Sequence, residues 1–315
     1  MSDSRPEPTQ NPGAAQAPSF AIRDERFHRT REFWRRFRRR PIGVISLIVL
    51  LLILFAAIFQ DVSARHDPLA QDFEALFATP SPDHFLGTDN LGRDSYARII
   101  FGARTAMQVG IVSVVIGLAA GLPIGLLAGF WGGRRDEVLM RIMDALFAFP
   151  SILLALIILV GLGNSGIDRL MLVSIAIGIP FVPGFARIIR GSTLSVKEQE
   201  YVTAAAAIGA SDLRIAARHI LPNTLAPIIV QASLLFGVAV IVEAALSFLG
   251  LGTQPPEPSW GIMLAQAQRF MVTGEFAKIQ LALYPGFAIS ITVLAFNLIG
   301  DVLRDLLDPR LRGAD

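Results

Sequence analysis

The sequence of 315 residues contains no cysteine and only four histidines. Without cysteine the chain forms no disulfide, holds no thiolate zinc site and has no cysteine nucleophile. Because the histidines lie far apart along the sequence, we predict no metal site. The four are His28, His66, His84 and His219.

A phosphate-binding P-loop is absent as well. That loop needs a lysine directly after a glycine and before a serine or threonine, but neither Lys197 nor Lys278, the two lysines of the chain, follows a glycine. Segment 161–166 matches the letters of the dinucleotide-binding motif GxGxxG, yet it ends an apolar run and no βαβ pattern surrounds it. We therefore predict that this chain hydrolyses no ATP by that route and binds no cofactor itself.

Charge is scarce, whereas apolar side chains are abundant. Hydrophobic residues make up 53% of the chain and charged residues 17%, and the mean hydropathy is +0.54. A soluble globule of this length cannot bury so many apolar side chains, so the composition predicts a protein embedded in the lipid bilayer. The formal net charge of +2 is too small to indicate a nucleic-acid partner.

Six long apolar segments predict six transmembrane helices. Each is close to or above the roughly 18 residues that cross a hydrocarbon core as a helix, and a helix satisfies its own backbone groups there. The sequence therefore predicts an all-α integral membrane protein. The predicted spans are 42–59, 106–131, 145–167, 170–186, 224–242 with its continuation past Glu243, and 279–300.

Arginines predict the orientation, because cytoplasmic flanks collect Lys and Arg. A basic run at 23–40 precedes the first span and places the N-terminus inside, and an even number of spans then places the C-terminus inside as well. Segment 60–104, predicted outside, carries seven acidic residues against four arginines. The alternative is a signal peptide at 42–59, cleaved after Ala64. Its apolar core exceeds the usual length of about 7 to 15 residues and its leader is long, so we favour an uncleaved span.

The inside loop 201–223 predicts two short helical pieces around Gly209. The loop can form a small, mostly apolar helix face, which suits insertion into a groove on another protein. This face contains Val202, Ala205, Ala206, Ile208 and Gly209. The simpler interpretation is an ordinary alanine-rich interfacial helix. The N-cap of the next span is predicted at Asn223 or Thr224.

This loop resembles a known motif. The spacing from Ala204 through Gly209 to Pro222 is similar to the EAA loop of ABC importer permeases, which docks in a cleft of the ATPase subunit. The leading glutamate of that motif is Thr203 here, so the resemblance implies a matching shape rather than a charge pair. Further segments look like the second permease of dipeptide and oligopeptide importers, the DppC/OppC type, and the resemblance covers roughly residues 30 to 312. They are 84–94, 243–252, 258–261 and 297–310.

The resemblance implies a type I ABC importer permease fold in a bacterial or archaeal cytoplasmic membrane. It also implies three kinds of partner: a second homologous permease (DppB/OppB-like), two ATPase subunits or domains (DppD/DppF-like) that hold ATP and Mg, and an extracytoplasmic substrate-binding protein. Di- or oligopeptides are the expected cargo, with nickel chelates, glutathione, opines and some oligosaccharides as alternatives. A secondary transporter and an intramembrane hydrolase are disfavoured, because the spans show neither repeats with several charges nor a nucleophile with its base.

Composition, apolar runs and arginine placement predict the outer divisions of the chain, and the resemblance adds the permease core, its coupling loop and residue roles. The predicted organisation is a disordered tail (1–22), a basic juxtamembrane segment (23–41), the first transmembrane helix (42–59), an external segment (60–104), a five-helix permease core (105–300) containing the coupling loop (191–223), and a cytoplasmic tail (301–315). The ATPase-coupling candidates are Tyr201, Val202, Thr203, Ala204, Ala205, Gly209, Ala210, Leu221 and Pro222.

Two polar residues in the predicted spans are candidates for the translocation pathway. Glu243 is a carboxylate at membrane depth, which needs a protein or water partner. It either faces the pathway or lies near the outer end of its span and holds helices together. Asn297 is a second pathway candidate, although hydrogen bonding between helices is the favoured interpretation.

Glycines recur every four residues in the second span and line one helix face, which predicts close helix packing. Pro123, Pro180 and Pro183 are predicted to kink their helices, with a gating role as the alternative. The glycines are Gly117, Gly121, Gly125 and Gly129.

The external segment is dense in turn residues between Gly87 and Asp94. A plain turn is the simpler interpretation, and docking of a soluble binding protein is the alternative. The order of acidic residues does not match an EF-hand loop, so we predict no calcium site. The docking candidates are Gly87, Asp89, Arg93 and Asp94.

Overall fold

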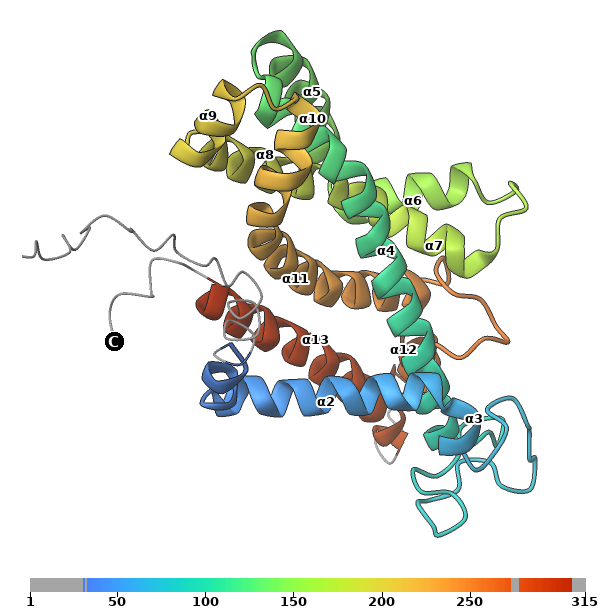
Figure 1. The fold of residues 1–315 in the computed structure, drawn as a ribbon. Coiled ribbons are helices and arrows are strands. Elements are labelled where there is room, and N and C mark those ends of the chain that lie inside the picture. Colours follow the sequence, from blue (N-terminus) through green and yellow to red (C-terminus); the bar gives the residue numbers. More distant parts are fainter. Residues whose placement is uncertain (1–30, 32, 273–277, 308–315) are drawn as a thin grey trace, which may run out of the picture.

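The computed structural model describes residues 31, 33–272 and 278–307 (Figure 1). The predicted tail 1–22 lies outside these residues, as do residues 23–30 and 32 of the basic run and residues 308–315. Within the described residues the secondary structure is helical, apart from one isolated antiparallel bridge between Thr88 and Asp94. The prediction of an all-α protein is confirmed.

Five candidate membrane spans occur in the described part of the chain. Three are single helices: α2 (Pro41–Ile58), α4 (Ser95–Trp131) and α13 (Gln280–Leu307). The fourth joins α7 (Arg169–Gly178), the 3-10 turn η1 (Ile179–Phe181) and α8 (Val182–Lys197), and the fifth joins α10 (Asp212–Ile215), the π turn η2 (Ala216–Ile220) and α11 (Leu221–Phe248). Three short helices lie outside the candidate spans and the region 133–161: α3 (Gln60–Ser63), α9 (Glu200–Ala207) and α12 (Trp260–Val272).

The predicted continuous span at 145–167 is wrong. This region belongs to two helices, α5 (Gly133–Phe147) and α6 (Ser151–Gly161), which are bent by 87° at a short break. The break lies at Pro150, because a proline donates no backbone hydrogen bond and disfavours the helical conformation in the residue before it. If the bent pair counts as one span, the described chain has up to six.

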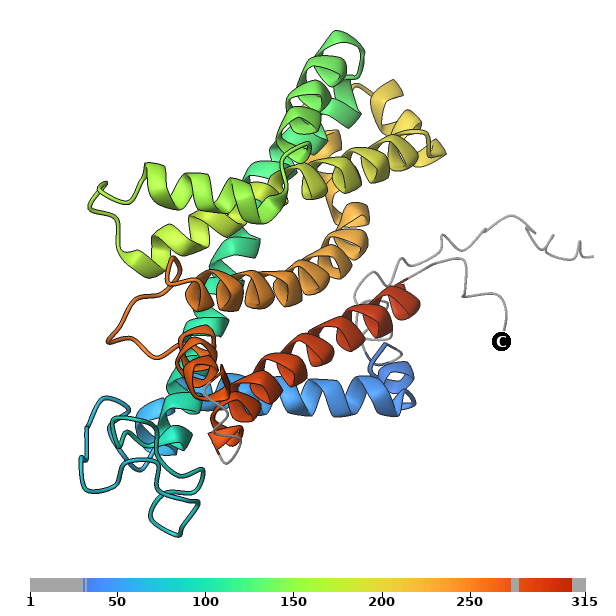
Figure 2. The ribbon, with the colours of Figure 1, turned by 180° about the vertical axis from the view of Figure 1, so that it is seen from behind.

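Helix α4 crosses the other long helices and packs against α2, α7, α8 and α11, as Figures 1 and 2 show from opposite sides. Its glycine stripe faces α8. A Cβ added at Gly117, Gly121, Gly125 or Gly129 would lie 2.5 to 2.7 Å from its nearest neighbour, closer than real Cβ atoms pack. The neighbours belong to residues 181–193, so the stripe lets the backbones of α4 and α8 approach directly.

The three prolines that were predicted to kink helices lie in three different settings. Pro180 is part of η1, and Pro183 lies in the first turn of α8, where its missing N–H is tolerated. Pro123 lies inside α4, which continues as one helix through it.

Two helix boundaries and one additional helix differ from the sequence-based expectations. Helix α4 begins at Ser95, well before residue 106, because the Asp94 side chain accepts a hydrogen bond from the Ala97 backbone N–H (2.7 Å) and caps the helix. The expected N-cap of the fifth span at Asn223 or Thr224 is wrong, since α10 continues through η2 into α11. Helix α12 was not expected, because its 13 residues are too few to cross a bilayer.

Candidate functional site

The segment 200–215 forms a corner of two short helices, α9 and α10, at one end of the molecule (Figure 1). Gly209 makes the corner with φ of +85°, a conformation that suits glycine. Its backbone N–H donates to the Ala206 carbonyl (3.0 Å), and that of Ala210 donates to the Ala205 carbonyl (3.1 Å), which ends α9 with a left-handed cap. A Cβ on Gly209 would meet nothing within 4 Å, so the backbone angle rather than space demands glycine here.

The apolar face of α9 points partly into the protein. Val202 is 4% exposed and packs with Phe130, Ile215 and Ile220, and Ala205 is also buried. The expectation that Val202 and Ala205 are available for docking is therefore wrong. These side chains attach the corner to the end of α4 and to the start of the α10–α11 span.

The outer surface of the corner is formed by other side chains. Ile208 is 86% exposed and Leu213 is 76% exposed, which leaves two large apolar side chains on the surface. Thr203 and Ala204 are exposed as well, and the Thr203 hydroxyl makes only a long hydrogen bond (3.5 Å) to Gln199 in its own helix. The predicted apolar face included Ile208, whereas Leu213 was not among the sequence candidates. Both are large apolar residues on either side of the turn at Gly209, and this pattern can be seen in the sequence.

Hydrogen bonds fix the corner to neighbouring helices. Lys197 Nζ donates to the Phe130 carbonyl at the end of α4 (2.5 Å), and Trp131 Nε1 donates to Asp212 Oδ2 (3.2 Å). Asn223 Nδ2 donates to the Tyr201 hydroxyl (3.1 Å) and thereby joins α9 to α11. Beside Asn223, Leu221 is half-buried and Pro222 is exposed in the first turn of α11.

Two ion pairs between α5 and α8 flank the same end of the molecule and were missed by the sequence analysis. Arg190 forms a bidentate pair with Asp136, with Nε–Oδ1 and Nη2–Oδ2 distances of 2.5 and 2.6 Å. Arg187 Nη2 lies 2.7 Å from Asp144 Oδ1. No signal along the sequence pairs these residues, because each partner is about fifty positions away.

Glu243 lies near the C-terminal end of α11 and is 1% exposed. Its Oε1 accepts hydrogen bonds from the hydroxyls of Ser247 (2.7 Å), Ser259 (2.9 Å) and Thr253 (3.0 Å). These hydroxyls belong to α11 and to the segment that leads into α12. The geometry favours the interpretation that Glu243 holds segments together over the interpretation that it faces a pathway.

Asn297 lies on the side of α13 that faces α11. Its Oδ1 lies 3.1 Å from the position that a Cβ on Gly237 would take. Among the described residues its side chain makes no hydrogen bond, so the expected link between helices is not observed.

The external docking candidates lie inside a tight turn. Gly87 has φ of +69°, and a Cβ there would collide with the Ala78 carbonyl. Asp89 forms ion pairs with Arg93 (2.8 Å) and Arg98, and both arginines donate to Gln266 Oε1 on α12. Burial alone raises the pKa of the Asp89 carboxyl, but the two arginines outweigh it and hold that pKa below its usual range.

The side chains of Asp89, Arg93 and Asp94 are at most 9% exposed. They close the turn and cap α4, so the simpler interpretation of a structural turn describes them. The exposed apolar side chains of this segment are others, with Phe73 68% exposed and Phe85 47% exposed.

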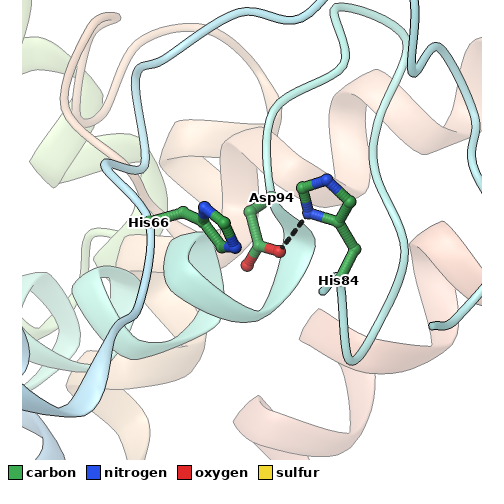
Figure 3. Close-up of side chains that lie close together, drawn as sticks. All are labelled: His66, His84 and Asp94. Carbon is green, nitrogen blue, oxygen red and sulfur yellow. Dashed lines mark hydrogen bonds and ion pairs between the residues drawn. The ribbon is translucent and has the colours of Figure 1, made fainter. Parts of the chain in front are cut away.

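Three potential metal ligands meet beside this turn (Figure 3). They are His66, His84 and Asp94, and their ligand atoms all lie within 4.8 Å of one another. We had predicted no metal site because the histidines are far apart along the sequence. In the structure the chain folds back, so His66 and His84 lie close together.

Comparisons with known proteins agree on a transport family. A family model described as "Binding-protein-dependent transport system inner membrane component" matches residues 121–313, and one described as "N-terminal TM domain of oligopeptide transport permease C" matches residues 29–80. The chain is 45% identical over 283 residues to the glutathione transport system permease protein GsiD of Pectobacterium atrosepticum, covering 90% of this chain and 91% of that protein. GsiD of an Escherichia coli strain matches with the same identity and coverage.

Among solved structures, a chain of the MetNI methionine ABC transporter, from a study of its inward-facing conformations, matches with a TM-score of 0.54. The match covers 66% of this chain and 96% of that chain at 19% identity. At this identity the likeness concerns the fold alone.

Proposed function

Because the chain belongs to the family of binding-protein-dependent transport system inner membrane components, we propose that its α9–Gly209–α10 corner is the place where a separate ATPase subunit drives it. The chain is a membrane permease subunit of an ATP-driven ABC importer, of the DppC/OppC type. The observation that carries the proposal is the corner itself. It presents exposed Ile208 and Leu213 outward and packs Val202 inward.

The packing supports a route for the motion. Val202 contacts Phe130 at the end of α4 and Ile215 and Ile220 at the start of the fifth span. Since α10, η2 and α11 follow one another without a loop, a push on α10 is carried along the span from Asp212 to Phe248. The glycine stripe locks α4 to α8, so these helices move as a unit.

The exposed side chains define the contact that we propose with the ATPase. Ile208 and Leu213 offer apolar surface for a groove on that partner, as an apolar helix face does in other groove complexes. Thr203, in place of the motif glutamate, is exposed and uncharged, so this contact relies on shape.

ATP and Mg belong to the ATPase partners in this proposal. A second homologous permease completes the pathway, and an external binding protein delivers the solute.

We propose six spans with both ends of the chain in the cytoplasm of a bacterial or archaeal cell. The bent pair α5–α6 then counts as one broken span, with the arginine-rich α5 on the cytoplasmic side. The external segment 60–104 and the outer loops lie on the far side of the membrane, and the coupling loop 191–223 and the tail 301–315 lie inside.

The proposed cargo is a small peptide. Relatives that are 45% identical are named for glutathione transport, and glutathione is itself a peptide, so the two substrate expectations converge on one chemical class. Dipeptides and glutathione are therefore the solutes to test first.

The experiment is uptake by the complete importer in proteoliposomes, with labelled glutathione and a labelled dipeptide and with ATPase activity measured in parallel. Replacing Gly209 by valine forces a β-branched side chain into a left-handed backbone conformation. We expect uptake to fall at least about tenfold and the binding protein to stop stimulating the ATPase, while the complex still assembles.

Two control variants make the test specific. Gly209→Asn should retain most uptake, because asparagine tolerates the left-handed conformation. Gly286→Val changes a glycine in α13, outside the coupling loop, whose Cβ would meet nothing and whose φ is not positive, so it should also transport. Normal coupling in Gly209→Val would refute the role of the corner.

A further inference from the structure

We propose that His66, His84 and Asp94 form a zinc-binding site in the external segment (Figure 3). The site does not depend on the proposed coupling role, because it lies in a separate part of the chain. Two imidazoles and one carboxylate are ligands that zinc accepts, with a water molecule in the fourth position.

Asp94 is oriented before any ion binds. One oxygen, Oδ1, accepts the backbone N–H of Ala97 (2.7 Å) and caps α4. The other, Oδ2, lies 2.8 Å from His84 Nδ1. The cap therefore fixes the carboxylate and turns Oδ2 toward the two imidazoles.

His84 is held in its own tight turn. Its backbone N–H donates to the Ser81 hydroxyl (3.0 Å), and its carbonyl accepts from the backbone N–H groups of Ser81 and Gly87 (both 2.9 Å). These contacts involve only backbone atoms of His84. They fix the point from which its ring projects and leave the ring nitrogens out of the turn. The imidazole is left half-buried beside Asp94.

His66 supplies the third ligand from the loop after α3. Its ring centroid lies 4.9 Å from that of His84, and its Nε2 lies 2.9 Å from the Asp83 carbonyl. The side chain is exposed and lines a cavity of about 690 Å³, so an ion reaches it from outside. On binding zinc, the His66 ring exchanges its contact with the carbonyl for the metal.

The distances fit a zinc ion after a small adjustment. Two ligands about 2.0 to 2.1 Å from a tetrahedral zinc ion lie about 3.3 to 3.4 Å apart. The distance between His84 Nδ1 and Asp94 Oδ2 is 2.8 Å and must increase slightly when zinc binds. The widest distance between ligand atoms in the cluster is at most 4.8 Å and must shorten by about 1.4 Å. His66 is the exposed member and makes that movement.

Zinc replaces a proton in this arrangement. The hydrogen bond between His84 Nδ1 and Asp94 Oδ2 carries one proton. When the metal takes its place between the two atoms, that proton moves to Nε2 of the same ring, so the imidazole stays neutral. Calcium and magnesium prefer oxygen ligands and should not compete.

The chain is well suited to a direct test, because it has no cysteine and few histidines. The purified full-length chain, prepared without a histidine tag, is dialysed against micromolar zinc, and bound metal is counted by mass spectrometry. We expect about one zinc per wild-type chain, and X-ray absorption should show nitrogen and oxygen ligands at about 2.0 to 2.1 Å.

Three variants assign the site. His66→Gln removes the exposed ligand and keeps the bond of His84 to Asp94, so it should fold and bind zinc at least about tenfold more weakly. The double variant His66→Ala with His84→Ala should bind none. His219→Ala is the matched control on the opposite side of the membrane and should bind like the wild type.

Zinc should also raise the melting temperature of the wild type and of His219→Ala, but not that of His66→Gln. Failure of the wild type to bind more zinc than the double variant would overturn the proposal. Equal binding by His66→Gln and the wild type, or loss of zinc in His219→Ala, would overturn it as well.

Discussion

At the scale of single residues, the burial and hydrogen bonds of Glu243 indicate a structural role for its carboxylate. A carboxylate within a span is tolerated only beside polar partners, and here one of its oxygens accepts hydrogen bonds from three hydroxyls on two segments. The side chain has almost no exposed surface within this chain. Glu243 therefore joins the end of α11 to the segment that precedes α12.

This arrangement predicts the outcome of replacing Glu243. Changing it to leucine leaves three buried hydroxyls without their acceptor, which should lower the free energy of unfolding by about 1 to 3 kcal/mol. Glu243→Gln keeps an acceptor oxygen and should lose less. Thermal unfolding of the purified importer measures both. Wild-type stability of Glu243→Leu together with lost uptake would instead place the residue in the translocation pathway.

Asp89 shows the same effect outside the spans. Two arginines hold its pKa below the usual range, so it remains charged under physiological conditions and keeps the turn attached to α12. A residue that looked available for docking is thus committed to the internal structure. Arg98 and Gln266 complete this network. Arg98 lies in the first turn of α4, before the predicted start of that span, and Gln266 lies in α12, which was not expected.

At the scale of helices, the contact between α4 and α8 depends on the absence of side chains. Along the stripe from Gly117 to Gly129, each glycine faces an atom of α8 or η1 too closely for a Cβ. Where the facing atom belongs to the backbone, the neighbour cannot move aside without moving its helix.

Gly125 is the sharpest test of this contact. An added Cβ would lie 2.5 Å from the Ala186 carbonyl oxygen, so Gly125→Ala should destabilise the protein by about 1 to 3 kcal/mol. Gly286→Ala is the matched control in α13, where a Cβ would meet nothing within 4 Å, and it should be neutral or slightly stabilising. Thermal unfolding of both variants measures the difference. Equal melting temperatures would contradict close packing of α4 on α8.

At the scale of the whole molecule, the arrangement of the spans determines which loops meet the ATPase and which meet the binding protein. The described chain has five candidate spans and a bent pair. Since α6 has only 11 residues, about 16 Å of helix, it does not cross a hydrocarbon core alone. Whether the bent pair completes a crossing decides on which side the loop after α6 lies.

Single cysteines report this topology directly, because the natural chain has none. With six spans and both ends inside, Ser165→Cys in the loop after α6 should react with an impermeant maleimide in intact cells. Ser211→Cys in the coupling corner should react only after the membrane is opened. Both positions are exposed, so burial does not limit labelling. Labelling of Ser211→Cys from outside, or protection of Ser165→Cys, would contradict the proposed topology.

The sequence by itself determined the all-α class and the transport family. Backbone groups in hydrocarbon must be satisfied within each segment, so long apolar runs have only one regular structure available. The motifs of residues 84–94 and 201–223 then pointed to the permease family that the comparisons show. Both signals are local, and a local signal can be read without knowing how the chain folds back.

Only the tertiary structure decided what each side chain faces. The inward packing of Val202, the burial of Asp89 and the meeting of His66 with His84 and Asp94 all depend on segments that are distant in the sequence. The break between α5 and α6 likewise became visible only once the two helices were placed. Contacts of this kind arise from the path of the whole chain, and neither hydropathy nor spacing encodes that path.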